Sequence, residues 1–302
     1  MDKEQIKGHL AAITSNVIFG LNITVTKSLL SAWMSPMGYT MTRMIFGVIV
    51  FWLIALVRGN EKVNRKDLVF FLICALLGIV FYQGAFSIGI GFVTPVLWSL
   101  IMALNPVVIL LLSALLLKEA MTIKKVFGVI IGIAGVVLII NKTGDGGVSS
   151  NIVLGICLAF FGVISNGLYI VITRKTSAKY ETITIMKWMF LFSAIIISPF
   201  GIRELPAQRL YSQEISIIPI LQLGFALFFS SLLAFFLIPV SLKRIKATVA
   251  SVYINLQPIV ASVVAIIVGQ DIFSWDKPLA LILVILSVLI VTQEPKNKML
   301  KQ

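Results

Sequence analysis

Leu104-Asn105-Pro106-Val107-Val108 lies near the middle of one apolar stretch of this 302-residue chain, and Leu256-Gln257-Pro258-Ile259-Val260 lies near the middle of another, 152 residues later. In each stretch a side-chain amide precedes a proline. A proline inside a helix removes a backbone hydrogen bond, and a carbonyl freed in this way is costly in hydrocarbon. Broken helices at corresponding places of a duplicated membrane chain are typical of transporters.

The composition indicates an all-α integral membrane protein. Hydrophobic residues make up 59% of the chain and charged residues only 12%, which is too little polar surface for a soluble fold. The net charge of +13 is explained by basic residues on the cytoplasmic side of a membrane protein, so we expect the lipid bilayer, and no nucleic acid, as a partner. Cys74 and Cys157 lie within apolar runs without metal-ligand spacing, and we expect no metal and no cofactor.

Ten stretches fit the template of a membrane span, which needs about 20 mostly apolar residues. They are residues 9–29, 36–57, 68–88, 94–117, 124–141, 151–173, 182–201, 215–238, 247–268 and 277–293. Of the 25 lysines and arginines, 18 fall in one alternating set of connections and termini, and only five fall in the other. The excess of positive charge on the cytoplasmic side of membrane proteins therefore predicts that both termini are cytoplasmic.

The polar, glycine-rich segment around residues 142–150 divides the chain into two halves. We expect a first repeat at 1–141, a linker at 142–150, and a second repeat with a cytoplasmic tail at 151–302. Each half has five predicted spans, so the second copy enters the membrane from the opposite side and the repeats are inverted. The first helices of the two halves also match at a shift of 147, which pairs Gly20 with Gly167.

Several motifs are shared with a known family. They are the opening helix Asn16-Val-Ile-Phe-Gly-Leu-Asn-Ile-Thr-Val-Thr-Lys27, Arg43, the run from Ala103 to Glu119, and Gly128, Gly132 and Gly135. Over essentially its whole length the chain resembles the EamA-type ten-helix members of the drug/metabolite transporter superfamily. The resemblance implies a bacterial inner-membrane carrier that moves small metabolites or drugs through a central cavity between inverted repeats. The chain departs from the family where a Gly-Glu pair is common, because Lys118-Glu119 and Gln270-Asp271 stand there instead.

Polar side chains near the helix breaks are candidates for lining a cavity. Asn105 and Gln257 either repair their own broken helices or offer hydrogen bonds to a solute. Ser15, Phe19, Asn22 and Thr26 share one helix face, and Gly162, Asn166, Tyr169 and Thr173 are their counterparts in the second half. We expect Asn22, Asn166 and Tyr169 to face the cavity, whereas helix packing is the alternative for the small and hydroxyl residues.

Two cations fall within predicted spans. Arg43 and Lys187 each cost at least about 2.5 kcal/mol at that depth unless paired or hydrated, and no carboxylate lies within a predicted span. Both could instead reach the interface or bond to freed carbonyls. If either faces the cavity, a solute with a carboxylate is favoured. The aromatic and amide candidates for the cavity are Tyr82, Gln83, Trp98 and Tyr253.

The absence of intramembrane carboxylates argues against a proton relay, with Glu119 and Asp271 as outlying candidates for coupling. We therefore expect an exporter or facilitator of amino acids or organic anions that works by alternating access. A multidrug or nucleoside efflux carrier is the alternative within transport, and a non-transporting receptor or assembly subunit is the alternative outside it. An enzyme is not expected, because no nucleophile with a base is found at membrane depth. The oligomeric state is open.

Overall fold

The computed structural model describes residues 3–59, 61–117, 123–143, 151–177, 179–212, 216–245 and 247–292. Within these ranges the chain is helical and contains no strand, so the predicted all-α class is confirmed there. Glu119, residues 144–150 of the linker and the tail beyond Thr292 lie outside the described residues.

The first half contains seven α-helices and one π-helical segment among the described residues. They are α1 (Lys3–Ala32), α2 (Pro36–Arg58), α3 (Arg65–Ala75), η1 (Leu76–Phe81), α4 (Tyr82–Gly89), α5 (Pro95–Met102), α6 (Asn105–Leu117) and α7 (Ile123–Thr143). The π-helical segment η1 joins α3 to α4 without a break, so these three form one long rod.

The described residues of the second half form eight α-helices, one π-helical segment and one 3-10 turn. Its elements are α8 (Ile152–Ser177), α9 (Thr182–Gly201), α10 (Arg209–Ser212), α11 (Ile217–Phe225), η2 (Ala226–Ala234), α12 (Phe235–Leu242), α13 (Ala247–Val252), η3 (Tyr253–Asn255), α14 (Leu256–Ile267) and α15 (Asp276–Thr292). Here η2 is a π-helical segment between α11 and α12, as η1 is in the first half, and η3 is a single 3-10 turn.

Within the described residues, seven helical stretches are long and apolar enough to cross a membrane. They are Lys3–Ala32, Pro36–Arg58, Arg65–Gly89, Pro95–Leu112, Ile152–Thr173, Thr182–Gly201 and Ile217–Leu242, and two shorter apolar stretches are Val126–Gly135 and Tyr253–Ile267. Their number and apolar character show a multi-pass membrane protein.

Both predicted helix breaks occur directly before their prolines. Helix α5 ends at Met102 and α6 begins at Asn105, so Ala103 and Leu104 form the interruption. In the second half the 3-10 turn η3 ends at Asn255, two residues before Gln257-Pro258. The missing amide hydrogen and the ring of proline weaken the preceding turn of an α-helix, and at these two places that turn tightens or opens.

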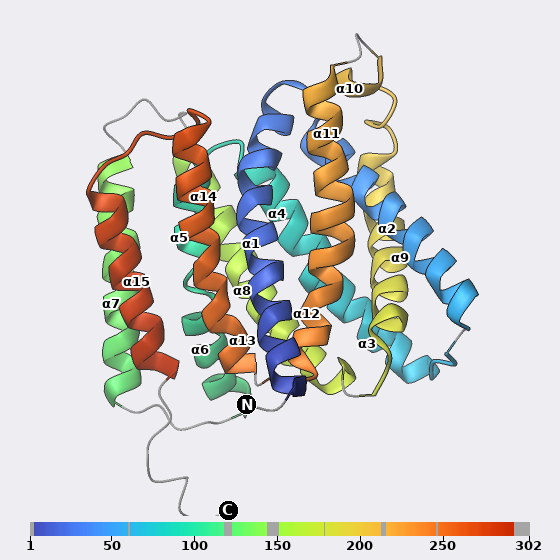
Figure 1. The fold of residues 1–302 in the computed structure, drawn as a ribbon, viewed down its shortest axis with the longest axis horizontal. Coiled ribbons are helices and arrows are strands. Elements are labelled where there is room, and N and C mark those ends of the chain that lie inside the picture. Colours follow the sequence, from blue (N-terminus) through green and yellow to red (C-terminus); the bar gives the residue numbers. More distant parts are fainter. Residues whose placement is uncertain are drawn as a thin grey trace, which may run out of the picture.

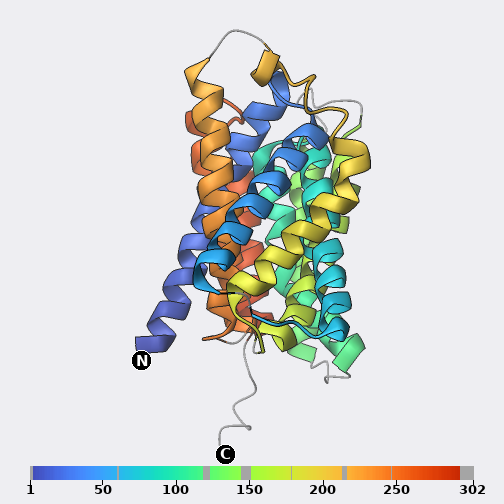
Figure 2. The ribbon, with the colours of Figure 1, turned by 90° about the vertical axis from the view of Figure 1, so that its right-hand side faces the viewer.

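The helices form an elongated bundle with α1 and α8 in its middle (Figure 1). Helix α1 packs against α14 and α12, and α8 packs against α6 and α4. The pair α7 and α15 lies at one side of the bundle, whereas α2 and α9 pack together at the other side, where they lie side by side in Figure 2. Helix α1 begins and α15 ends at the same end of the bundle, which we call the N-terminal end; the opposite end carries α10 (Figure 1).

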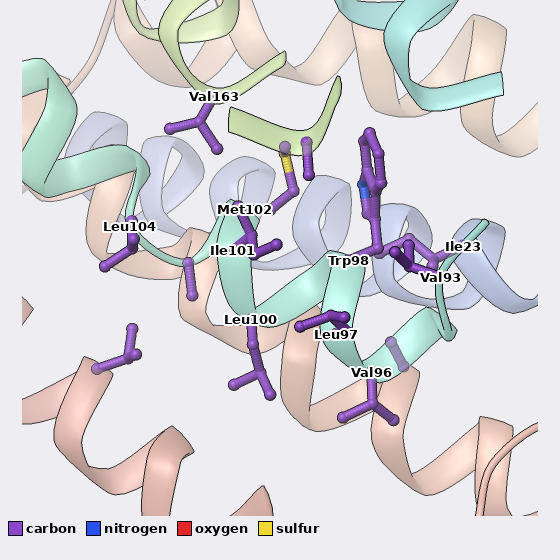
Figure 3. Packing of buried hydrophobic residues seen from close by; sticks show 14 of the residues in the cluster. Ile23, Val93, Val96, Leu97, Trp98, Leu100, Ile101, Met102, Leu104 and Val163 are labelled. Carbon is purple, nitrogen blue, oxygen red and sulfur yellow. The ribbon is translucent and has the colours of Figure 1, made fainter. Parts of the chain in front are cut away.

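Trp98 on α5 belongs to a buried apolar cluster that also contains residues of α1, α8 and α14. Figure 3 shows its ring pointing toward α8, with Leu97, Ile101 and Met102 on the same short helix. Its exposed fraction is 1%, and its ring centroid lies 5.3 Å from that of Phe86. A Cβ atom at Gly89 would be 2.5 Å from the Trp98 ring, so only glycine fits there. Helix α5 is thus buried around its circumference, which fixes the position of the break that follows it.

Candidate functional site

A cavity lies between helices of both halves, next to the break in the second half. Its walls come from α1, the η1–α4 junction, α8, α12, and the segment from α13 to α14. Seven polar side chains line it: Ser15, Asn16, Tyr82, Asn166, Tyr169, Ser241 and Gln257. The remaining lining is apolar or small and includes Phe19, Ile170, Phe235 and Ile254. We call this space the central cavity.

An amide pair joins α1 to α14 at the wall of the central cavity. The Nε2 atom of Gln257 donates a hydrogen bond to Oδ1 of Asn16 at 2.7 Å, and Nδ2 of Asn16 donates to the carbonyl of Ala12 at 2.8 Å. Both amides are buried. The amide nitrogen of Gln257 therefore bonds to α1. It does not bond to a carbonyl freed in its own helix, which was one of the two possibilities considered from the sequence.

Tyr169 lines the central cavity and packs on the π-helical segment η1. A Cβ atom at Gly78 would be 2.6 Å from the Tyr169 ring, so the ring lies directly on the backbone of η1. The exposed fraction of Tyr169 is 1%, and its hydroxyl has no hydrogen-bond partner among the described groups. The hydroxyl of Ser241, on α12, is also buried without a partner there. Such groups cost about 1–3 kcal/mol each when unsatisfied. Neither hydroxyl oxygen is exposed to the cavity in this conformation.

Arg43 is buried outside the central cavity, in a polar cluster between α2, α4 and η2. Its guanidinium donates from Nε to Ser231 Oγ at 2.7 Å, from Nη1 to Gln83 Oε1 at 2.7 Å, and from Nη2 to Ser230 Oγ at 3.1 Å. Its Cζ lies 5.3 Å from the centroid of the Tyr39 ring. All three hydrogen-bond acceptors are uncharged, and we call these four hydrogen-bonded residues the Arg43 cluster.

The Arg43 cluster joins the π-helical segment η2 to the first turn of α4, which directly follows η1. Ser230 and Ser231 lie within η2, and Gln83 is the second residue after η1. Hydroxyls also satisfy carbonyls in both segments, because Ser231 Oγ donates to Ala226 at 2.9 Å and Ser165 Oγ donates to Leu77 at 2.7 Å. Irregular turns of this kind occur often at functional sites. Sequence reasoning missed Ser230 and Ser231, although adjacent serines within an apolar span were a visible signal.

Lys187 lies between two indole rings on the α2–α9 side of the bundle. Its Nζ is 5.2 Å from the ring centroid of Trp52 and 5.9 Å from that of Trp188, and its exposed fraction is 3%. An ammonium over the face of an indole ring is stabilised by the ring quadrupole. Lys187 therefore has an aromatic environment that is separate from the lining of the central cavity.

The structure brings four of the predicted site residues together and places the others elsewhere. Tyr82, Asn166, Tyr169 and Gln257 line the central cavity. Asn22 and Asn105 are buried elsewhere, with unpaired carbonyl oxygens, and Gln83 and Arg43 belong to the Arg43 cluster. Trp98 lies in the apolar core, and Lys187 lies beside the Trp52 and Trp188 rings. The hydroxyl of Tyr253 is 2.8 Å from His9 Nδ1. Pro106 and Pro258 are buried directly after the breaks.

Matching contacts fix the starts of α2 and α9. Ser35 precedes α2, and its backbone N–H donates to Oε1 of Gln208 at 2.7 Å. Glu181 precedes α9, and its backbone N–H donates to Oε2 of Glu61 at 3.1 Å. In each case a side chain from the other half satisfies a free donor at a helix start.

The contact at the start of α9 belongs to a charged cluster at the N-terminal end. Lys179 Nζ lies 2.5 Å from Asp67 Oδ2, and this hydrogen bond raises the pKa of Lys179 because it stabilises the charged form. Lys243 Nζ donates to the carbonyl of Tyr180 at 2.8 Å, and burial lowers the pKa of Lys243. Arg244 pairs with Glu4 at 2.8 Å, which ties the end of α12 to the start of α1.

Within the described residues, no group of three or more His, Cys, Asp or Glu side chains is arranged to hold a metal ion. The central cavity measures about 60 Å³. A cavity of about 150 Å³ is needed to hold a molecule the size of benzene, so this space accommodates a few water molecules.

Known proteins resemble this chain in sequence and in fold. The model of the EamA-like transporter family matches residues 6–141 and 153–293. "Uncharacterized transporter YyaM" of Bacillus subtilis (strain 168) is 30% identical over 232 residues, which cover 74% of this chain and 73% of that protein. An "Uncharacterized transporter" of Methanothermobacter thermautotrophicus is 25% identical over 303 residues, covering 94% and 85%. A solved crystal structure of another protein superposes with a TM-score of 0.66 at 20% identity over 95% of each chain, which shows a common fold.

Proposed function

The chain belongs to the EamA-like transporter family, and from that premise we propose that it moves small metabolites by alternating access around the central cavity. The observation that carries the proposal is the cavity itself. It is enclosed by helices of both halves, it adjoins the broken helix at Gln257, and seven polar side chains line it. Binding sites of secondary transporters are formed at such repeat interfaces by discontinuous helices.

We propose that the two halves are inverted repeats of five spans each, with their boundary at 142–150. The packing supports this, because exchanging the halves converts one set of contacts into the other. Helix α1 packs on α14 as α8 packs on α6, α1 packs on α12 as α8 packs on α4, and α2–α9 and α7–α15 are pairs between corresponding helices. The two stretches matched by the family model also lie on either side of this boundary.

Individual residues repeat the same relation. A Cβ atom at Gly20 of α1 would be 2.8 Å from Val260 Cβ, and one at Gly167 of α8 would be 3.3 Å from Val108 Cγ1. Gly20 corresponds to Gly167 in sequence, and Val260 corresponds to Val108. The contacts at Ser35 and Glu181 are related in the same way, and they lie at opposite ends of the α2–α9 pair.

The small volume of the cavity supports a mechanism in which the helices separate. About 60 Å³ does not hold a metabolite, so transport requires the walls to move apart. Ties between the halves exist at both ends, through Ser35 and Gln208 at the α10 end and through Glu4 and Arg244 at the N-terminal end. Alternating access requires one set of such ties to open while the other holds.

The predicted setting is a bacterial inner membrane with both termini in the cytoplasm, and the protein acts as an exporter or facilitator rather than as an enzyme. Amino acids or organic anions are the expected solutes if Arg43 or Lys187 becomes part of the cavity wall during transport. The charge of Arg43 supports this class, since its three hydrogen bonds to described residues all go to uncharged groups. Nucleosides or drug-like molecules are expected if the wall stays uncharged.

Transport is tested with purified protein in liposomes preloaded with labelled amino acids, nucleosides or organic acids, by following exchange with external unlabelled solute. We expect saturable exchange of at least one solute, and Gln257→Leu should reduce it. Gln222→Leu is the matched control, because Gln222 bonds to Ser28 at 3.1 Å outside the cavity. If folded protein exchanges no solute above the rate of protein-free liposomes, the proposal is wrong.

A further inference from the structure

A second hollow lies at the α10 end of the bundle and shares no lining residue with the central cavity. Its walls are the end of α1 and the residues before α2 in the first half, and the segment that contains Glu204 and Arg209 in the second half. We call it the α10-end hollow. We propose that it binds a small zwitterion, a solute that carries a carboxylate and an ammonium group beside an apolar side chain. The inference rests on the transport function proposed above, to which it adds a second binding site.

The α10-end hollow is large enough for a metabolite in the conformation of this structure. Its volume is about 370 Å³, against about 60 Å³ for the central cavity. Small-molecule sites measure roughly 300–1,000 Å³. The hollow also lies beside the hydrogen bond of Ser35 to Gln208, which ties the two halves at this end. A solute can therefore bind here before the helices move, at a place that has to open during alternating access.

Arg209 provides the positive charge of the α10-end hollow. Its side chain is exposed, and its Cζ lies 5.1 Å from the centroid of the Trp33 ring. The backbone N–H of Leu210 donates to the carbonyl of Trp33 at 3.2 Å, which holds α10 against this segment. Among the described residues, no acceptor takes a hydrogen bond from the Arg209 guanidinium. A guanidinium that stacks on a ring keeps the donors at its edge, and two of them match the two oxygens of a carboxylate.

Glu204 provides the negative charge. Its side chain is half-buried, and its Oε2 accepts hydrogen bonds from Ser35 Oγ and from the backbone N–H of Gly38, the latter at 3.2 Å. Both donors are uncharged, so within the described part of the chain no cation neutralises this carboxylate. The other oxygen, Oε1, accepts no hydrogen bond from a described residue, and a carboxylate oxygen of this kind is a strong acceptor for an ammonium group.

The two opposite charges face one hollow without pairing with each other. Arg209 lies over Trp33, whereas Glu204 bonds to Ser35, two residues further along the same segment. The buried side chain of Gln208 fixes the relative position of the two halves here, since it accepts from the backbone N–H of Ser35 at 2.7 Å. An anion would satisfy only Arg209 and would be repelled by Glu204, and a cation would have the opposite difficulty. A zwitterion satisfies both charges.

The lining between the charges has an apolar part, to which Leu30, Met34 and Ala207 contribute. Contact with such side chains removes apolar solute surface from water, which is favourable. The fit is therefore best for a zwitterion whose side chain is apolar.

The test measures equilibrium binding of three labelled probes to the full-length protein in detergent. They are L-leucine; 4-methylpentanoate, which lacks the ammonium group; and 3-methylbutylamine, which lacks the carboxylate. We expect leucine to bind at least about tenfold more tightly than either analogue, because each analogue loses one charged interaction.

Substitutions at the two charges assign this binding to the α10-end hollow. Arg209→Gln should weaken leucine binding about tenfold and leave the affinity for 3-methylbutylamine no lower. Glu204→Gln should weaken leucine binding similarly but not the binding of 4-methylpentanoate, and its amide oxygen can still accept from Ser35 and Gly38. Arg203→Gln is the matched control, because Arg203 is an exposed cation of the same connection that does not line the hollow, and it should leave all three affinities unchanged.

Gln257→Leu separates the two sites, since Gln257 lines the central cavity and not the α10-end hollow. Leucine binding that depends on Arg209 should persist in this variant. Leucine affinity that is unchanged in Arg209→Gln and Glu204→Gln, or that is lost in Gln257→Leu, would overturn the zwitterion site, whereas solute exchange by the same protein in liposomes would leave the transport function intact. Binding that depends on Arg209, without exchange of any solute in liposomes, would instead overturn the proposed function.

Discussion

Nη1 of Arg43 on α2 lies 2.7 Å from Oε1 of Gln83 on α4, and both side chains are buried. The same guanidinium reaches Ser230 and Ser231 in η2, so one side chain joins three membrane helices. Lysine cannot reproduce this arrangement, because an ammonium is a compact point charge without the planar fork of donors. We expect Arg43→Lys to lower the free energy of unfolding by about 3 kcal/mol, since two charged hydrogen bonds are lost. Denaturation in mild detergent measures the change.

The loss of stability in Arg43→Lys can be compared with the loss when one hydrogen-bond partner of Arg43 is removed. Ser230→Ala deletes the longest of the three bonds, at 3.1 Å, and should cost about 1 kcal/mol. If Arg43→Lys is as stable as the parent protein, the Arg43 cluster does not hold these helices together.

The contacts of α1 and α8 with the helices after the breaks predict an asymmetry between two glycines. A Cβ atom at Gly20 would lie 2.8 Å from Val260 Cβ and 3.0 Å from the carbonyl of Gln257, whereas the nearest atom at Gly167 would be 3.2 Å away, on a flexible leucine. Gly20→Ala should therefore destabilise the protein by about 1–3 kcal/mol, and Gly167→Ala by less. Thermal unfolding of the two variants measures this order.

Gly84 on α4 is the control for these substitutions, because a Cβ atom there meets nothing within 4 Å. Gly84→Ala should be neutral or stabilising by up to about 1 kcal/mol, since alanine is the better helix former. Equal losses at Gly20 and Gly84 would show that helix packing at Gly20 is not as close as described.

The breaks of the fold were predictable from the sequence, because their cause is local. Pro106 and Pro258 each lack an amide hydrogen, which favours an interruption of the helix just before them. Pro199 and Pro239 lie inside continuous helices, so a proline alone does not require a break. The all-helical class followed from composition in the same direct way. The π-helical segments η1 and η2 were not predicted, since no proline marks them and their hydrogen bonds depend on hydroxyls such as Ser165 on a neighbouring helix.

The site was predictable only in part, because its residues are brought together by packing. Tyr169 and Gln257 stood out as polar groups in apolar spans, and both line the central cavity. Asn16 and Ser241 were missed, since Asn16 lies beside the polar stripe of its helix and Ser241 lies at the end of α12. Arg43 was recognisable as an intramembrane cation, but its partners in η2 are 187 and 188 residues away, and the sequence gives no register between them.

Lys27 on α1 provides a prediction about the loop after α4. Its Nζ donates to the carbonyls of Ile90 at 2.7 Å, Gly91 at 3.2 Å and Val93 at 3.2 Å. These carbonyls end or follow a helix, where the free acceptors and the helix dipole favour a cation. We expect Lys27→Met to lower the free energy of unfolding by about 2 kcal/mol, because charged hydrogen bonds to partly buried carbonyls are lost. Lys7→Met removes only an exposed ion pair with Glu4 and should have no measurable effect, so a similar loss in both variants would contradict the assignment.

The orientation of the bundle gives the last prediction. Lys7, near the start of α1, and Arg244, just after the end of α12, lie at the N-terminal end of the bundle. Arg209 on α10 lies at the opposite end (Figure 1). Because basic residues are retained on the cytoplasmic side, the N-terminal end should face the cytoplasm. In a protein with Cys74 and Cys157 replaced by alanine, a membrane-impermeant maleimide should label Arg209→Cys in intact cells. Lys7→Cys should react only after the cells are permeabilised, which also serves as the control for reactivity. Labelling of Lys7→Cys in intact cells would contradict the predicted orientation.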